Sequence, residues 1–355
     1  MITISLCMIV KNEEAVLGRC LESVGTAADE IIVVDTGSTD RTREIAKAHG
    51  ARIYDFEWID DFAAARNFAF EKAGMQYCMW LDADDLLLPG DRDALLRLKQ
   101  TLDPAVDVVM LRYNTAFGQD GEPTFSYYRE RILKNHADFR WEGAVHEAIA
   151  PRGRVEYAEI AVTHKKERAG DPLRNLRIYE SMLARGRSLV PRERFYYARE
   201  LYYNARYDDA VRELEAFLRQ PEGWIENQLE ACRCIAWCKS ALGDADGALR
   251  ALLGAMAYAA PRAELCCEIG RCFFERGDYP TAVFWYELAL TRERDDRTGG
   301  FVSPDCYGYL PCIQLCICYD RLGDREKAKA YNERAGSYKP DDPSVLYNRA
   351  YFAKN

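Results

Sequence analysis

The chain has 355 residues, of which 48% are hydrophobic and 30% are charged, a composition typical of globular domains. Its length favours two domains over a single core. The formal net charge of −9 argues against nucleic-acid binding, because phosphate contacts need a dense basic face. No apolar run reaches the roughly 18 residues of a membrane span, so we expect a cytoplasmic protein without a membrane partner.

Residues 1–170 predict an α/β domain with a mainly parallel sheet, because short β-branched runs alternate with stretches of helical spacing. The predicted strands are Ile4–Val10, Glu30–Asp35, Arg52–Asp55 and 77–82, followed by a pair of strands over 106–113 and 125–133. The predicted helices are 15–24, 42–49, 62–73 and 92–102. A helical linker over 171–192 then leads to an all-α domain over 193–355.

The second half carries an internal repeat in which a turn is followed by a helix. Gly243 and Gly277 each begin the same phrase, Gly-Asp-x-x-x-Ala, and they lie 34 residues apart. That period is typical of tetratricopeptide helix pairs, in which small residues let neighbouring helices approach. The phrase recurs at Gly323 after a longer interval, so residues 292–303 are predicted to be an inserted loop, and residues 341–352 to be a capping helix.

Thirteen cysteines are present, and ten of them lie at or beyond Cys232. The four histidines all lie in the first half, and paired C-x-x-C knuckles are absent from the sequence. We therefore expect buried reduced thiols, with a metal cluster as the alternative.

Three carboxylates follow directly after the hydrophobic run that begins at Tyr77, and they form the strongest local signal. Asp82, Asp84 and Asp85 stand within four positions of one another. Neighbouring carboxylates raise one another's pKa, so this pattern indicates a divalent cation that keeps them ionised. Mg²⁺ or Mn²⁺ at this place would also hold a nucleotide diphosphate. The alternative is that Asp84 or Asp85 only caps a following helix.

Further motifs occur in a fixed order before and around this acidic group. They are MIVKNEE at 8–14, IIVVDTGSTD at 31–40, ARN at 65–67 and DAD at 82–84. Together they resemble the family 2 glycosyltransferases, which are inverting enzymes with the GT-A fold, and the resemblance covers about residues 1–170. Ligands of open α/β sheets bind beyond the carboxyl ends of the strands, which is where these motifs are predicted to lie.

The resemblance implies a UDP-sugar donor and assigns a role to several positions. It places Asn12 and Glu13 by the nucleoside, Asp35 on the uracil, Arg66 beside the nucleotide and Asp82 near the ribose. The resemblance also implies that Asp84 binds the metal, with Asp82 as a further metal ligand. The other motif positions expected at the nucleotide sugar are Val10, Gly37, Ser38, Asn67, Ala83 and Trp141.

A second motif, WEGAVHE at 141–147, is also found in family members with appended repeats. The resemblance implies that Glu147 is the general base and that His164 completes the metal site, with Glu142 as the reserve base and His146 as an orienting residue. An inverting transfer needs one carboxylate to accept the proton of the attacking nucleophile. For His164 the alternative is a packed or solvated side chain.

Two other classes of protein compete with this interpretation. A nicotinamide dehydrogenase would need a G-x-G-x-x-G loop after the first strand. This chain lacks that loop, because Gly18 is the only glycine between Val10 and Leu21. The other alternative is a repeat scaffold that only presents peptides. Such a protein would show no turnover of nucleotide sugar.

The acceptor is predicted from the repeats and from the similarity to peptide S-glycosyltransferases of the sublancin type. Helical repeats form grooves for extended peptides and also homodimer interfaces, so we expect a peptide or protein acceptor, linked through Cys or Ser/Thr, and a homodimer formed by the repeat domain. A cell-surface polysaccharide or lipid acceptor is the alternative.

Overall fold

The computed structural model describes residues 1–118, 121, 123–167 and 170–354. The chain divides into two compact units, Met1–Ser188 and Leu189–Asn355. The division lies within the segment 171–192 that was predicted as a linker. Among the helices of the described residues, none is both long enough and apolar enough to cross a bilayer.

The first unit contains one eight-stranded sheet in the order β3-β2-β1-β4-β7-β6-β8-β5. Its strands are β1 (Ile4–Val10), β2 (Glu30–Asp35), β3 (Arg52–Asp55), β4 (Tyr77–Trp80), β5 (Asp85–Leu87), β6 (Val108–Phe117), β7 (Pro123–Lys134) and β8 (Val155–His164). Strands β3, β2, β1 and β4 are parallel, whereas β7 pairs antiparallel with both β4 and β6. The predicted α/β class is therefore confirmed, with a mixed sheet.

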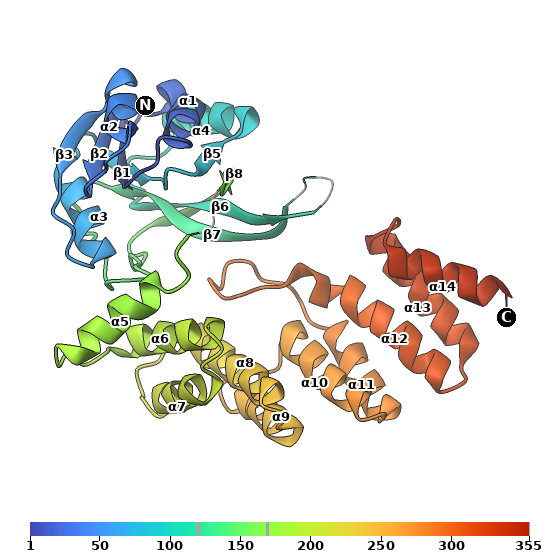
Figure 1. Ribbon diagram of the computed structural model, residues 1–355. Helices are drawn as coiled ribbons and strands as arrows, with labels where there is room; N and C mark the ends of the chain where they lie inside the picture. Colours follow the sequence, from blue (N-terminus) through green and yellow to red (C-terminus); the bar gives the residue numbers. More distant parts are fainter. Residues whose placement is uncertain (119–120, 122, 168–169, 355) are drawn as a thin grey trace. The chain divides into compact units, whose positions relative to one another are not determined.

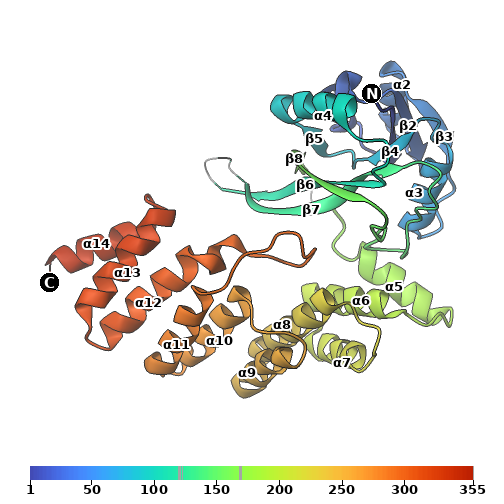
Figure 2. The same ribbon diagram turned by 180° about the vertical axis from the view of Figure 1, so that it is seen from behind.

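Helices cover both faces of this sheet. They are α1 (Leu17–Val24), α2 (Thr42–Ala48), α3 (Phe62–Glu71) and α4 (Pro89–Thr101), with a short 3-10 helix at Gly25–Ala27. The first unit also contains α5 (Arg174–Ala184). Helices α1, α2 and α4 lie on one side of the sheet and α3 on the other (Figure 1, Figure 2). Successive residues of β1 explain this: Leu6 and Met8 pack in the core that includes α1, whereas Cys7 packs in the core beneath α3.

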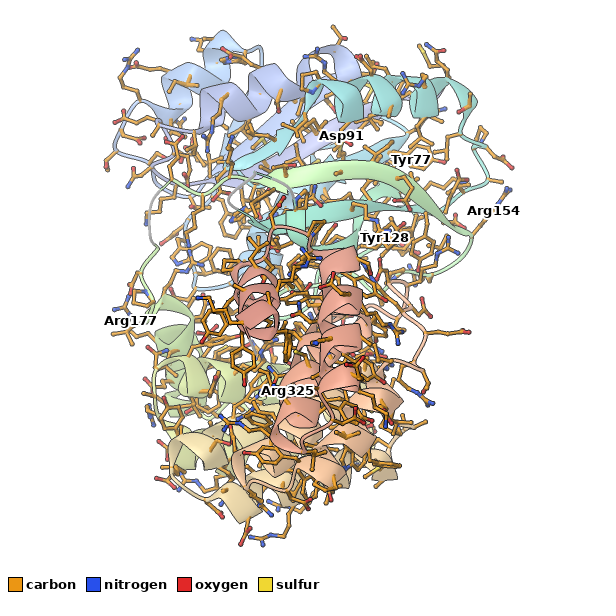
Figure 3. The ribbon with its side chains drawn as sticks, turned by 90° about the vertical axis from the view of Figure 1, so that its right-hand side faces the viewer. Tyr77, Asp91, Tyr128, Arg154, Arg177 and Arg325 are labelled. Atoms are coloured by element: carbon orange, nitrogen blue, oxygen red, sulfur yellow. The ribbon has the colours of Figure 1, made fainter. Side chains whose placement is uncertain are left out.

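The register of the parallel strands sets the position of the site. Val10 at the end of β1 pairs with Asp35 at the end of β2, and Cys7 pairs with Trp80 at the end of β4. The loops after these three strands therefore leave from the same edge of the sheet. Further from this edge, the buried Tyr77 hydroxyl of β4 donates to the Val106 carbonyl oxygen at 2.8 Å and ties the central strand to the segment before β6 (Figure 3).

Strand β5 is three residues long and was not predicted. It pairs antiparallel with β8, which places Asp85 opposite His164. This pairing brings the acidic segment after β4 next to the end of the last strand. The predicted strands 106–113 and 125–133 are present as β6 and β7, which pair antiparallel.

The second unit consists of helices. They are α6 (Pro191–Tyr203), α7 (Tyr207–Leu218), α8 (Ile225–Ala241), α9 (Ala245–Gly254), α10 (Ala263–Glu275), α11 (Tyr279–Ala289), α12 (Tyr309–Arg321), α13 (Arg325–Tyr338) and α14 (Pro343–Lys354), with 3-10 helices at Ala255–Ala257 and Pro304–Tyr307. Consecutive helices α8 and α9, α10 and α11, and α12 and α13 pack against each other. The predicted all-α second half is thus confirmed, and residues 292–303 form a loop between α11 and α12.

The repeated Gly-Asp phrase has the same structure each time. Gly243, Gly277 and Gly323 have φ values of 80°, 76° and 83°, which is the left-handed conformation that favours glycine after a helix. The aspartate that follows each glycine caps the next helix by accepting a backbone N–H; the pairs are Asp244 to Gly247, Asp278 to Thr281 and Asp324 to Lys327. All thirteen cysteines are buried free thiols, as expected.

Candidate active site

The loops after β1 and β2 are tied together by their own side chains. The backbone N–H of Asn12 donates to Ser38 Oγ at 3.0 Å, and Asn12 Oδ1 accepts the backbone N–H of Thr39 at 2.8 Å. The backbone N–H of Glu13 donates to Thr42 Oγ1 at 2.7 Å. Asn12 has a φ of 56° and Gly37 a φ of 100°, so both loops turn sharply at the sheet edge. The predicted nucleoside residues Asn12, Glu13 and Ser38 therefore lie together.

Asp35 ends β2 beneath these loops and is 2% exposed. Its Oδ1 accepts the backbone N–H of Ser38 at 3.0 Å, and its Oδ2 accepts from Arg43 Nη1 at 2.8 Å. Burial alone raises the pKa of Asp35, but the hydrogen bonds from Ser38 and Arg43 outweigh burial and hold this pKa below its usual range. The carboxylate is thus kept ionised at the carboxyl end of the strand. Arg43 also pairs with Asp55, and sequence reasoning did not single it out.

Arg66 of α3 joins two of the predicted acidic residues. Its Nε donates to Glu147 Oε1 at 2.6 Å, and its Nη2 donates to Asp82 Oδ1 at 2.7 Å. The guanidinium lies 4.9 Å from the ring centre of Trp80 and 5.0 Å from that of Trp141. Two buried aromatic rings and two carboxylates therefore hold it in place.

The Arg66 charge also affects its acidic partners. Burial raises the pKa of Asp82, but the charges of Arg66 and Arg131 outweigh burial and lower this pKa to about 2. The same carboxylates raise the pKa of Arg66, which stays protonated at all ordinary pH values. This arrangement places Glu147 one side chain away from the acidic segment after β4.

A tight turn presents Glu147. Asn67 of α3 fixes its start, since Asn67 Nδ2 donates to the Trp141 carbonyl oxygen at 3.0 Å and Asn67 Oδ1 accepts the Trp141 N–H at 2.9 Å. Glu142 and Ala148 then pair through two backbone hydrogen bonds of 3.0 and 3.1 Å. The Glu142 side chain is exposed, whereas Glu147 points to Arg66. The turn therefore leaves Glu147 less exposed than Glu142.

The backbone of this turn is constrained at two positions. Gly143 has a φ of 93° and His146 a φ of 51°, so His146 adopts a conformation that is uncommon for a residue with a side chain. His146 is half-buried and directly precedes Glu147.

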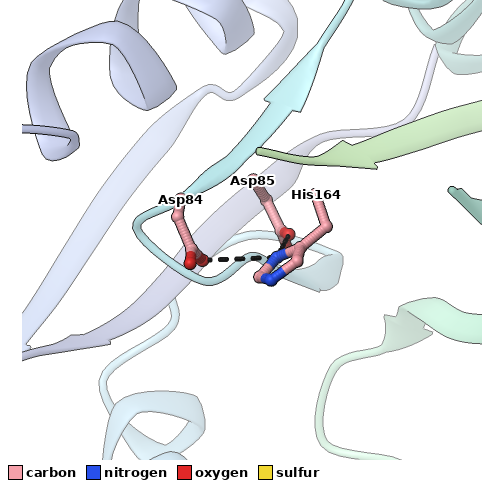
Figure 4. A group of neighbouring side chains, drawn as sticks. All are labelled: Asp84, Asp85 and His164. Atoms are coloured by element: carbon pink, nitrogen blue, oxygen red, sulfur yellow. Dashed lines mark hydrogen bonds and ion pairs between the residues drawn. The ribbon is translucent and has the colours of Figure 1, made fainter. Parts of the chain in front are cut away.

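A second acidic group lies where β5 meets β8. It consists of Asp84, Asp85 and His164, whose ligand atoms lie within 4.8 Å of one another (Figure 4). His164 Nδ1 is 3.4 Å from Asp84 Oδ1 and 3.2 Å from Asp85 Oδ1. Asp84 and His164 are both predicted metal ligands, and the structure brings them together. The third predicted ligand, Asp82, is instead paired with Arg66, and Asp85 takes its place in the group.

Burial, followed by the charges of Asp82 and Asp85, raises the pKa of Asp84 against the opposing charge of His164. The pKa of His164 is raised by its hydrogen bond to Asp85 and by the surrounding carboxylates. The group thus carries excess negative charge that a cation would relieve. Carboxylate oxygens with one imidazole fit Mn²⁺, and carboxylates with water fit Mg²⁺, so the residues present suit the expected metal.

Asp85 is held by residues that the sequence analysis did not single out. Arg131 of β7 is 0% exposed and donates through Nη1 to Asp85 Oδ2 at 3.1 Å. The Tyr113 hydroxyl of β6 donates to Asp85 Oδ1 at 3.0 Å and lies 3.0 Å from His164 Nδ1. A charged residue such as Arg131, next to the apolar Ile132 and Leu133 of a predicted strand, is the one sequence signal that could have indicated this partner.

The predicted residues therefore fall into three hydrogen-bonded groups at the sheet edge. Asn12, Ser38 and the loop of Asp35 form the first; Asp82, Arg66 and Glu147 form the second; Asp84 and His164, with Asp85, form the third. Val10 pairs with Asp35, and the buried Ala83 lies between Asp82 and Asp84. Glu142 is the predicted catalytic residue that the turn leaves on the surface.

Parallel strands with helices on both faces, and polar loops beyond the carboxyl ends of the strands, define the open α/β class, whose ligands bind at that edge. Within this class, residues 5–152 match the model of Glycosyl transferase family 2. The family that the motifs predicted for this domain is therefore confirmed.

Three curated relatives each match less than half of the chain. A TPR repeat-containing protein of Synechococcus elongatus is 40% identical over 151 residues, which cover 42% of this chain and 36% of that protein. The lipopolysaccharide core biosynthesis glycosyltransferase LpsC of Rhizobium meliloti is 31% identical, with coverages of 43% and 58%. The SPbeta prophage-derived glycosyltransferase SunS of Bacillus subtilis is 30% identical, with coverages of 41% and 34%. The chain thus spans about a third to somewhat over half of the length of these relatives.

Proposed function

We propose that the first unit is a metal-dependent inverting glycosyltransferase that moves a hexose from a UDP-sugar to an acceptor nucleophile. The observation that carries this proposal is the bridge of Arg66 between Glu147 and Asp82. It links the candidate base to the acidic segment after β4. Such a link is expected if donor phosphate and acceptor nucleophile meet at one place.

In this proposal Glu147 accepts the proton of the acceptor while the nucleophile attacks the anomeric carbon. The bond from that carbon to the UDP oxygen breaks on the opposite face, so the configuration inverts. Arg66 positions the Glu147 side chain, and the strained backbone at His146 orients the turn that carries Glu147. Asp84 and His164 would hold Mn²⁺ or Mg²⁺, which supplies charge neutralisation for the leaving diphosphate.

The nucleoside end of the donor is assigned to the loops after β1 and β2. Asp35 is an ionised acceptor at the end of β2, where a uracil N–H would find a charged hydrogen-bond partner. Asn12, Glu13, Gly37 and Ser38 would surround the nucleoside because they belong to the two loops that meet above Asp35.

For the acceptor we propose a peptide or protein side chain, either Cys or Ser/Thr. The helical repeats of the second unit support this choice, since repeat arrays bind extended peptides and also form homodimers. The resemblance to the peptide S-glycosyltransferases of the sublancin type points the same way. The similarity to LpsC supports the second candidate, a polysaccharide or lipid acceptor. A scaffold without turnover is the remaining alternative.

Incubation of the purified chain with Mn²⁺, a panel of UDP-sugars and candidate peptides tests the proposal by mass spectrometry. We expect a gain of one hexose on a peptide, UDP release, and loss of both in Asp84→Ala. We expect Glu147→Gln to reduce turnover by about 10²- to 10⁴-fold, as for loss of a general base. Glu142→Gln is the matched control, and its activity should stay near that of the wild type. Absence of UDP release with every donor would contradict the proposed activity and favour the scaffold.

A further inference from the structure

The carboxylate of Asp85 is fully engaged by the protein itself. Its Oδ2 accepts from Arg131 Nη1 and from the backbone N–H of Asp82, each at 3.1 Å. Its Oδ1 accepts from the Tyr113 hydroxyl at 3.0 Å and contacts His164 Nδ1 at 3.2 Å. An ionised carboxylate offers about four lone-pair positions, and the three donors and the imidazole nitrogen occupy them. Asp85 therefore has no lone pair left for a cation.

Asp84 differs from Asp85 in this respect. Its side chain is 24% exposed, and its ion pair within the described part of the chain is with His164. Asp85 is 0% exposed and lies behind the imidazole. A cation that arrives from solvent would therefore meet Asp84 first.

The contacts of His164 define its tautomer. Both dashed lines in Figure 4 end on the same ring nitrogen, Nδ1, and both of its carboxylate partners can only accept hydrogen bonds. We therefore assign the proton to Nδ1, and the Tyr113 oxygen can accept from it as well because that hydroxyl donates to Asp85. In the neutral ring, the free lone pair is then on Nε2.

We propose that Asp85 is a positioning residue and not a metal ligand: it holds the proton on His164 Nδ1 so that Nε2 is presented to the divalent cation beside Asp84. This inference rests on the proposed metal-dependent function. A metal-bound histidine commonly donates its second N–H to a carboxylate, which fixes the ring and strengthens the ligand. Arg131 in turn fixes Asp85, because its guanidinium is clamped between Trp80 and Tyr113 at 3.7 and 4.2 Å from their ring centres.

The substitution Asp85→Asn gives a sharp test because it changes the hydrogen-bond pattern and keeps the shape. Arg131 and the Asp82 N–H donate to one side of residue 85, so the new amide oxygen should stay there. Its NH₂ group would then face His164 and donate to Nδ1. The proton should move to Nε2, and Nε2 could no longer bind a cation.

Two measurements on the full chain check this. With ¹⁵N-labelled histidine in alkaline buffer, NMR should show the Nδ1–H tautomer for His164 in the wild type and in Asp84→Asn, and the Nε2–H tautomer in Asp85→Asn. His164→Gln identifies the signal among the four histidines. Mn²⁺ titration followed by electron paramagnetic resonance should show binding that is about 10- to 100-fold weaker in Asp85→Asn, and lost in Asp84→Asn.

Three results would overturn the inference. One is an Nε2–H tautomer in the wild type. The second is an unchanged tautomer and unchanged Mn²⁺ affinity in Asp85→Asn. The third is a complete loss of Mn²⁺ binding in Asp85→Asn with the Nδ1–H tautomer retained, which would make Asp85 a direct ligand. Failure of the proposed function gives a distinguishable result, because a wild type that releases no UDP could still show the expected tautomers.

Discussion

Single side chains join residues of the candidate site that are far apart in sequence, and Arg66 shows this most clearly. Its guanidinium is buried against two tryptophans and forms an ion pair with both Asp82 and Glu147. Removing one partner of a buried ion pair costs more than the pair itself contributes, because the remaining charge stays buried. The residue is therefore important for stability as well as for the position of the base.

We expect Arg66→Met to lower the free energy of unfolding by about 3–5 kcal/mol, because it removes the direct ion-pair partner of two carboxylates, Glu147 and Asp82. Urea denaturation followed by circular dichroism measures this change. Arg140→Met removes the exposed pair with Glu71 and is the matched control, with an expected change of at most about 1 kcal/mol. Equal effects of the two substitutions would show that the Arg66 bridge is not a buried ion pair.

At the scale of helices and strands, the sequence predicted the parallel half of the sheet well. Strands β1, β2 and β3 begin and end where the β-branched runs do, because each run is buried and ends at turn residues. Strand β5 could not be predicted in this way. Its three residues become a strand only by pairing with β8, whose end is 79 positions further along the chain.

The candidate site, like the sheet, could be predicted from the sequence only in part. The motifs located Asp35, Asp84, Glu147 and His164, because chemistry at strand ends leaves a local pattern of polar residues. They could not separate the roles of Asp82 and Asp85. Those roles depend on arginines from α3 and β7 that approach from different parts of the sequence.

The repeated helix caps give a prediction at this scale. Asp324 accepts the backbone N–H of Lys327 at the start of α13, so Asp324→Ala leaves that donor without its partner. We expect a loss of about 0.5–2 kcal/mol in the free energy of unfolding. Glu326→Gln in the same first turn is exposed and should change stability by about 0.5 kcal/mol or less. Thermal and urea unfolding of the two variants compare them directly.

At the scale of the whole molecule, each compact unit has its own hydrophobic cores. The cores of the sheet domain draw on residues 2–162, and those of the repeats on residues 232–345. Stability of the repeats and ligand binding by the sheet domain should therefore be separable by mutation.

Leu252 of α9 is 0% exposed in a core of the repeat unit. We expect Leu252→Ala to destabilise that unit by about 2–5 kcal/mol through lost burial and the cavity left behind. The affinity for UDP with Mn²⁺, measured by calorimetry, should stay within about twofold of the wild type, since none of the proposed binding residues belongs to this unit. Leu322→Ala is the exposed control, and a large loss of UDP affinity in Leu252→Ala would show that the units are coupled.

The pairing of β5 with β8 has a practical consequence for isolating the catalytic part. The family match ends at residue 152, before β8 begins, yet His164 stands at the end of that strand. A fragment cut at the family boundary would retain both aspartates and lack the imidazole and the strand that β5 pairs with. The smallest piece that could test the proposed ion binding must therefore extend through residue 164, beyond the family match.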